Sequence, residues 1–187
     1  MTSAGSTADL ANNTVSLPSM SGRPATDTYT HAYIIITNTF GLRGSVTIKN
    51  GAGNDVKYCS ETDGDSTAGT TAGSFCTAQD HTETLDDFGD GSFSAYFAPA
   101  TMDGGGKVSA LLTAADANLT TATNTGEVER LIGVFETNSG TPVVINNSTN
   151  GLEMQLTVTD IGYGIQFVNG EPYNFGSMPF KPVFATF

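Results

Sequence analysis

Short segments in which apolar and polar residues alternate recur from about residue 30 to residue 187. Such alternation is typical of β-strands that bury one face, and the Gly, Asn and Asp residues between the segments are typical of turns. Almost no segment has the apolar spacing of a helix. The pattern predicts an all-β protein, a sandwich or barrel of about eight or nine strands. The segments are 30–40, 44–49, 55–59, 92–98, 127–137, 141–146, 152–159, 163–169 and 180–187.

Two of these segments, 30–40 and 127–137, are apolar on both faces. In 30–40, Ala32, Ile34 and Ile36 face one way, and Tyr33 and Ile35 face the other. A strand of this kind is covered on both sides, which is more apolar surface than one sandwich needs. The last segment places phenylalanines on opposite faces in the same way. We therefore expect a subunit interface, with Tyr33, Ile35, Phe184 and Phe187 as candidate residues.

Other segments give more local predictions. The segments 44–49 and 55–59 flank the turn sequence NGAGN and are expected to form a hairpin. Residues 107–119 fit either a strand or a short helix, because Leu111 interrupts the polar face. The alternation is cleanest in 152–159, where the side chains expected to face the core are Leu152, Met154, Leu156 and Val158.

Residues 1–29 differ from the rest because Ser, Thr, Ala and Asn dominate them. A segment of this composition is disordered when it is free in solution. We therefore expect an extended N-terminal arm at 1–29, held either by its own β-sandwich domain, 30–187, or by a neighbouring subunit. Within the arm, Val15 and Leu17 alternate with polar residues, and this short piece could add as a strand to the sheet edge of a neighbour.

The charge is strongly one-sided, with 7 Lys and Arg against 19 Asp and Glu and a net charge of −12. Nucleic acid is not expected as a partner, because phosphate binding requires a basic surface. Anionic membrane surfaces are disfavoured for the same reason. An acidic surface with few lysines suits a very salty, halophilic or marine environment, where screening removes self-repulsion. Many secreted β-proteins are acidic as well.

Targeting and membrane-spanning segments are not recognisable in the sequence. No apolar run approaches the length of a membrane span, so we expect no direct membrane insertion. The first twenty residues lack the basic and apolar regions of a signal peptide. Either the protein is not secreted by that route, or a leader has already been removed.

Cys59 and Cys76 are the only cysteines of the chain. Two thiols do not complete a four-ligand zinc site, and only His31 and His81 could readily assist them. The C-x-x-C spacing of a redox motif is absent. A disulfide would close a long polar loop and stabilise the fold by about 3 kcal/mol. We favour this disulfide in an oxidising milieu, while free thiols and a bridge between chains stay open.

Three loops rich in Asp and Gly, 62–67, 84–92 and 101–106, raise the question of calcium. The EF-hand spacing does not occur in them. Asp and Gly are also ordinary turn residues, and we favour that interpretation, so no cofactor is expected. The candidate calcium ligands are Asp63, Asp65, Asp86, Asp87 and Asp90.

Motifs of catalysis are not recognisable either. The patterns G-x-S-x-G, H-E-x-x-H and the P-loop are absent, and His31 lies on an expected strand, where a packed or exposed side chain is the simpler interpretation. Paired carboxylates for glycoside hydrolysis stay open, because the fold and not the spacing sets them. A carbohydrate-binding module is disfavoured, because Trp is absent and sugars stack on aromatic rings. We expect no enzyme.

In its length of 187 residues, its strand number, its acidity and its polar arm, the chain resembles small single jelly-roll coat proteins of viruses. The acidity is similar to that of coat proteins from tailless membrane-containing viruses of halophilic archaea. No residue motif carries the resemblance, so it assigns no functional residues. It implies a single jelly-roll-like β-sandwich of about eight strands with an extended N-terminal arm. It also implies a structural subunit of the virion shell, a capsid protein that assembles with copies of itself and with other coat proteins.

Two other classes of function stay open. A filament or pilus subunit at the cell surface, polymerising by strand donation, would use the Val15 and Leu17 segment and the disulfide, although the missing leader counts against it. A secreted ligand-binding domain or hydrolase would show turnover or a ligand-dependent rise in melting temperature. The expected location is therefore the virion, with the extracellular space as the alternative.

Overall fold

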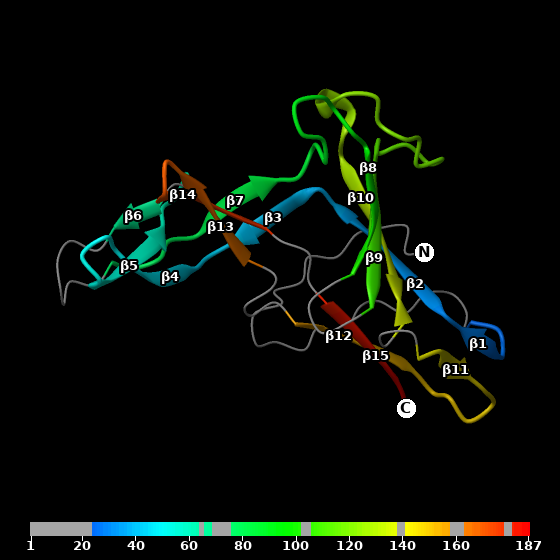
Figure 1. Ribbon diagram of the computed structural model, residues 1–187. Coiled ribbons are helices and arrows are strands. Elements are labelled where there is room, and N and C mark those ends of the chain that lie inside the picture. The colour runs from blue at the N-terminus through cyan, green and yellow to red at the C-terminus, as the bar shows by residue number, and fades with distance from the viewer. Residues whose placement is uncertain are drawn as a thin grey trace. The chain divides into compact units, whose positions relative to one another are not determined.

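In the computed structural model, regular secondary structure consists almost entirely of β-strands (Figure 1). Within the residues it describes there are fifteen strands, one short 3-10 helix at Thr125–Glu127 and no α-helix. The all-β prediction is therefore confirmed. No helix of this described part has the length and apolar character needed to cross a bilayer. The described residues are 24–63, 66–68, 76–101, 106–137, 141–157, 163–177 and 181–187.

The chain forms two compact units, each assembled from segments that are far apart in the sequence. The first unit contains Met1–Thr37, Asp86–Val158 and Phe180–Phe187. The second unit contains Asn38–Leu85 and Thr159–Pro179. The chain therefore passes from one unit to the other at residues 37–38, 85–86, 158–159 and 179–180.

A four-stranded antiparallel sheet is the larger layer of the first unit (Figure 1). The strand order is β2-β10-β9-β8, so both neighbours of β10 are long strands. The pairing of β8 with β9 is irregular between Phe97 and Ala100. The strands are β2 (His31–Thr37), β8 (Tyr96–Thr101), β9 (Lys107–Thr113) and β10 (Arg130–Glu136).

Four shorter strands form two antiparallel pairs in the same unit. One pair joins β1 (Asp27–Tyr29) to β11 (Val143–Ile145), so the last residues of the expected arm form a strand. The other pair joins β12 (Leu152–Thr157) to β15 (Lys181–Thr186). Strands β11 and β15 are in contact with each other. Together the two pairs supply a second layer of strands.

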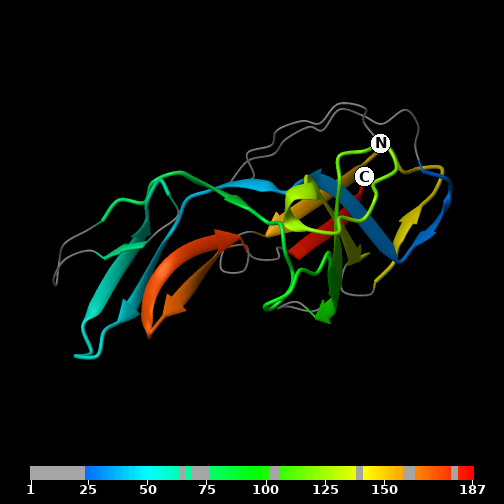
Figure 2. The same ribbon diagram turned by 90° about the horizontal axis from the view of Figure 1, so that it is seen from above.

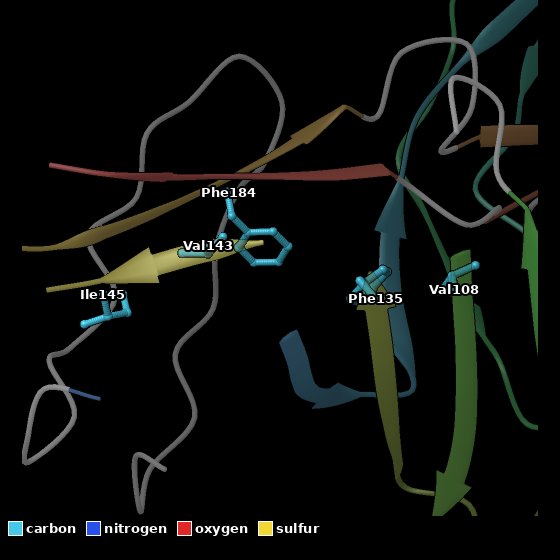
Figure 3. Packing of buried hydrophobic residues seen from close by; sticks show 5 residues of the cluster. All are labelled: Val108, Phe135, Val143, Ile145 and Phe184. Atoms are coloured by element: carbon cyan, nitrogen blue, oxygen red, sulfur yellow. The ribbon is translucent and has the colours of Figure 1, made fainter. Parts of the chain in front are cut away.

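The core of the first unit lies between these layers (Figure 3). The four-stranded sheet contributes Val108 and Phe135, and the short strands contribute Val143, Ile145 and Phe184. Each of these side chains is at most 7% exposed. Two layers of strands that share one core are typical of a β-sandwich. The partly buried side chains packed against the core are Tyr29, Ala32, Ile34, Phe97 and Met154.

The register of the strands explains which face is buried. Phe135 of β10 lies opposite Ala32 of β2 and Val108 of β9. Directly paired residues point to the same face of a sheet, so the odd-numbered positions of β10 face the core. Gly133 is one of them, and a Cβ there would come within 3.0 Å of the Phe135 ring. A larger residue at position 133 would collide with the Phe135 ring, so glycine is needed there.

The second unit consists of three small sheets. Strand β14 (Glu171–Ser177) contacts β3, β5 and β6, and Figure 2 shows the hairpin that contains it in orange. The buried side chains of this unit are of mixed polarity, including Phe175, Tyr58, Ser60 and His81. The sheets are β4 (Ser45–Lys49), β5 (Asp55–Ser60) and β6 (Ser66–Ala68); β3 (Thr39–Leu42) and β7 (His81–Thr84); and β13 (Tyr163–Val168) and β14.

The hairpin predicted for 44–59 is confirmed. Strands β4 and β5 pair from Ser45 opposite Cys59 to Lys49 opposite Asp55. The alternation within β4 is also as predicted, since its two apolar residues are half-buried and the other three are exposed. In the turn, Gly53 has a φ of +80°, which glycine adopts at no steric cost.

The segment 30–40 forms two strands instead of one. β2 ends at Thr37 and β3 begins at Thr39. Between them Asn38 is 6% exposed, and its backbone carbonyl accepts a hydrogen bond from the Leu85 N–H at 2.8 Å. This break adds one strand to the number expected. The other additional strands lie outside the segments predicted as strands, and they are β1, β6, β7, β9 and β14.

The structure also decides two other local predictions. The ambiguous segment 107–119 is a strand up to Thr113 and then a turn, in which Leu119 has a φ of +53°. The inward orientation expected of Leu152 is wrong, because its side chain is 49% exposed. Leu152 pairs with Thr186 at one end of the β12 and β15 ladder, beyond the core that Met154 contacts. The side chains of Leu156 and Val158 lie outside the described residues.

Candidate functional site

Cys59 and Cys76 form the predicted disulfide, with 5.9 Å between their Cα atoms. Cys59 lies in β5 and is 1% exposed. The Cys76 Sγ atom lies 3.4 Å from the Lys57 carbonyl oxygen. Cys76 is half-buried, and neither sulfur of the disulfide is a thiolate that could bind a metal. The loop between the cysteines is therefore stapled at its base.

Ser60 reinforces the same staple through hydrogen bonds. Its side chain donates to the Gln79 carbonyl oxygen at 2.8 Å and accepts from the Gly44 N–H at 3.2 Å. The Gln79 N–H also donates to the Ser60 carbonyl oxygen at 2.8 Å. The residue is 1% exposed, so these partners replace the water that its hydroxyl loses on burial. The site is structural.

The two histidines lie in different units, and each contacts residues of its own unit. His81 of β7 is 4% exposed, and its Nε2 atom lies 3.3 Å from the Phe175 carbonyl oxygen and 3.9 Å from Glu83 Oε1. His81 therefore links β7 to β14 inside the second unit. His31 of β2 is exposed, and its Nδ1 atom lies 2.9 Å from the Thr30 hydroxyl.

Those candidate calcium ligands that the structure describes lie outside the strands. The Asp87 carboxylate accepts hydrogen bonds from the N–H groups of Ser94 at 2.8 Å and Gly89 at 2.7 Å. These bonds favour the ionised form and hold the pKa of Asp87 below its ordinary value. No three acidic, His or Cys side chains of the described residues come together as a metal site would need. Asp86 is half-buried, Asp63 and Asp90 are exposed, and Asp65 lies outside the described residues.

Two further carboxylates of this kind had not been predicted from the sequence. Asp116 accepts hydrogen bonds from the hydroxyl and the N–H of Thr120, and Glu127 accepts from the N–H and the hydroxyl of Thr123. These bonds lower the pKa of both carboxyls. Both pairs fasten the connection from β9 to β10. The four-residue spacing of acid and Thr is the sequence signal that could have revealed them.

The remaining feature is the face of the four-stranded sheet that points away from the core. Because directly paired residues share a face, the registers define four rows on it. The two outer rows contain Thr37, Arg130 and Thr113 at one end and His31 with Glu136 at the other. The two central rows contain seven residues. We call these seven residues the outer face. Tyr33 is 60% and Tyr96 53% exposed, while the other five are half-buried. The central rows are Ile35, Ile132, Leu111 and Tyr96, and beside them Tyr33, Val134 and Ser109.

The four expected interface residues lie in different places in the structure. Tyr33 and Ile35 lie together on the outer face. Phe184 is 5% exposed and belongs to the core, so it is not accessible to another subunit in this structure. Phe187 is 69% exposed, and its backbone pairs with Gly151. The expected arm residues Val15 and Leu17 lie outside the described residues.

Comparisons with family models, curated proteins and solved structures give no match to this chain. The function is therefore inferred from the residues themselves. The disulfide loop, His81 and the turn carboxylates each interact within their own unit. Exposed large apolar side chains occur on several other strands as well, Phe167 and Tyr173 among them. The outer face combines the exposed Tyr33 and Tyr96 with half-buried aliphatic side chains, on a sheet whose other face already covers the core. It is the candidate functional site.

Proposed function

We propose that this protein is a structural subunit of a virion shell, a capsid or coat protein that assembles with copies of itself and with other coat proteins. The observation that carries the proposal is the outer face. Contiguous apolar surface of this kind is typical of interaction sites, and each square ångström removed from water stabilises by about 25 cal/mol. A neighbouring subunit would bury what the chain leaves exposed.

Other features support a structural role. The first unit has two layers of strands around one core, as a jelly-roll-like sandwich would have. The disulfide and the hydrogen bonds of Ser60 suit a subunit that persists in an oxidising extracellular or virion environment. The net charge of −12 keeps free subunits apart at low salt and repels them less when salt screens it. On this proposal residues 1–29 act as an arm that contacts neighbours.

Size-exclusion chromatography with light scattering, at low salt and at molar salt, tests the proposal. Large particles that depend on salt are expected, and imaging would distinguish shells from filaments. A matched variant with Tyr33→Ser and Tyr96→Ser should assemble less, while Tyr173→Ser, which changes an equally exposed tyrosine of β14, should assemble normally. A monomer under both conditions would exclude self-assembly.

An extracellular filament or pilus subunit is the second candidate, and the disulfide is the observation that favours it. Such a subunit would polymerise by donating the segment around Val15 and Leu17 to a neighbour's sheet edge. Deleting residues 1–20 separates the two functions. The deletion would abolish polymerisation by strand donation, whereas shells built through the outer face would form with altered contacts.

A further inference from the structure

We propose that Asn146 is an acceptor for N-linked glycosylation, with a lipid-linked oligosaccharide as the donor. The acceptor pattern N-x-S/T, or sequon, begins at Asn12, Asn118, Asn146 and Asn147. Sequons mark surface asparagines of secreted proteins, but the pattern alone does not say which copy is used. The structure distinguishes among the three copies that it describes, and Asn12 lies outside the described residues. This inference goes beyond the shell proposal and does not depend on it.

The sequon at Asn146 lies in an exposed turn of the connection from β11 to β12 (Figure 1). The Thr149 N–H donates to the Asn146 carbonyl oxygen at 3.0 Å and closes the turn. The N–H and the hydroxyl of Ser148 both donate to Asn146 Oδ1, at 2.9 and 2.6 Å. Asn146 and Ser148 are exposed. The turn therefore holds the acceptor amide and the hydroxyl that the pattern requires side by side on the surface.

The hydroxyls of the other two described sequons bind other groups. In the sequon that begins at Asn118, the Thr120 hydroxyl donates to the Asp116 carboxylate, which also accepts the Thr120 N–H. Hydrogen bonds to an ionised group are strong. In the sequon that begins at Asn147, the half-buried Thr149 hydroxyl accepts from the Asn146 N–H at 3.1 Å. These hydroxyls would have to leave their partners before a transferase could contact them.

The disulfide is an observation independent of the turn. The bond between Cys59 and Cys76 is of the kind that forms and persists in oxidising compartments, such as the lumen through which secreted chains pass. Sequons of secreted proteins are the ones that receive glycans. The disulfide therefore supports passage of the chain through a compartment in which Asn146 would meet a glycan donor.

The surroundings of the turn would benefit from a glycan. Val144 is 50% exposed and Leu152 is 49% exposed, and the two residues flank the turn along the chain. Both belong to the layer of short strands, which lies across the core from the four-stranded sheet. A glycan is bulky and solubilising. Attached at Asn146, it would hydrate this apolar edge and leave the outer face accessible.

The reaction forms one bond and breaks one bond. The Asn146 Nδ2 atom attacks the anomeric carbon of the donor, an oligosaccharide joined to a polyprenyl diphosphate. The new bond joins Nδ2 to the anomeric carbon, and the bond from that carbon to the diphosphate oxygen breaks. The polyprenyl diphosphate leaves with the electron pair, and a carboxylate of the transferase takes one proton from the amide. No oxidant or reductant takes part.

Transfer in vitro to the folded, full-length protein tests the inference. The protein is made without glycans and with N12Q as background, so that only the described sequons remain. It is incubated with a lipid-linked oligosaccharide and an oligosaccharyltransferase that requires only N-x-S/T. Mass spectrometry of the intact chain should show a single added glycan, and peptide mapping should place it on Asn146. A short sequon peptide verifies that enzyme and donor are active.

Two variants of Ser148 separate the sequons. S148A removes the hydroxyl that serves Asn146 and keeps the N-x-T pattern that begins at Asn147, and it should lose the glycan. S148T keeps a hydroxyl at this position and should retain the glycan. N118Q is the matched control and should be modified like the background protein. Circular dichroism verifies that each variant is folded.

Three results would overturn the inference. The folded background protein could stay unmodified while the sequon peptide is glycosylated. The glycan could be found on Asn118 or Asn147 instead of Asn146. S148A could be modified to the same extent as the background protein, which would show that the Ser148 hydroxyl has no part in selecting the acceptor.

Discussion

The two compact units are stabilised by different means. The first unit buries a cluster of apolar side chains between two layers of strands, with Phe135 and Phe184 among them. The second unit buries Ser60, His81 and Cys59 of the disulfide, together with the rings of Tyr58 and Phe175. Small β-structures with a limited apolar core commonly rely on covalent links. The comparison indicates that apolar packing is the main stabilising interaction in the first unit. In the second unit the disulfide and buried hydrogen bonds contribute more.

Phe135→Ala should have the largest effect and should act on the first unit. The ring is 4% exposed and lies in the core, so its removal leaves a cavity and costs about 3–5 kcal/mol. Urea unfolding should show this loss, with hydrogen exchange accelerated in β9 and β10. The control Tyr173→Ala removes an exposed ring of β14 and should change stability little. Equal losses in the two variants would contradict a packed core in the first unit.

Removing the disulfide should have the next largest effect, in the second unit. Cys59→Ser with Cys76→Ser frees the loop in the unfolded chain and should cost about 3 kcal/mol. Hydrogen exchange should accelerate in β4 and β5, while β9 and β10 keep their protection. If protection were lost to the same extent in both units, the staple would not be specific to the second. Reduction of the wild-type protein should reproduce the pattern.

Ser60→Ala tests the polar part of the second unit with the disulfide intact. The hydroxyl exchanges hydrogen bonds with Gln79 and Gly44, and leaving buried partners unsatisfied costs about 1–3 kcal/mol. The free energy of unfolding should fall by that amount in urea. Ser148→Ala, in an exposed turn of the first unit, is the matched control. An unchanged midpoint for Ser60→Ala would show that Ser60 adds nothing to the disulfide.

Acidification should give the smallest effect, and it should act on the first unit. Hydrogen bonds lower the pKa of Asp87, Asp116 and Glu127, all of which lie there. A lowered pKa stabilises the folded state fully above the ordinary value, 3.8 for Asp, and that stabilisation is lost as pH falls through the lowered value. Protection of β9 and β10 should therefore decline below about pH 4.

The double variant D87N/D116N is the test of this cause. It replaces two of the three carboxyls, so protection of β9 and β10 should depend less on pH in the acidic range. At neutral pH it should be slightly less stable, because a neutral amide oxygen accepts more weakly than a carboxylate. Identical pH profiles for the variant and the wild type would exclude these carboxyls as the source of acid sensitivity.

Local features could be predicted from the sequence because they depend on neighbouring residues. The hairpin at 44–59 follows from the turn sequence and the alternation of Val46 and Ile48. The disulfide follows from two cysteines without another use. The break at Asn38 was not predicted, although Thr37, Asn38 and Thr39 interrupt the apolar alternation there. The apolar pattern resumes at Phe40, and it does not reveal that β2 and β3 belong to different units. Period and composition do not say which sheet a strand joins.

The same reasoning explains the mixed outcome at the candidate site. Tyr33 and Ile35 were predicted from a strand that is apolar on both faces, and the registers place them on the outer face. The other members of that face come from three distant segments, which only the pairing brings together. The strand that contains Phe184 is likewise apolar on both faces, but the Phe184 side chain of β15 points into the core. The alternation in the sequence shows which face of a strand is apolar. Which other strands pair with it, and so what covers that face, is known only from the structure.

The order of the segments along the chain has a consequence for biosynthesis. The second unit ends with Thr159–Pro179, and the first unit resumes only at Phe180–Phe187. During translation, which proceeds from the N-terminus, every residue of the second unit is therefore made before Phe184 can reach the core of the first. The unit that begins first is completed last. Until then its unfinished apolar layer is exposed, and a chaperone that shields apolar surface would bind nascent chains that stop before β15 more readily than full-length ones.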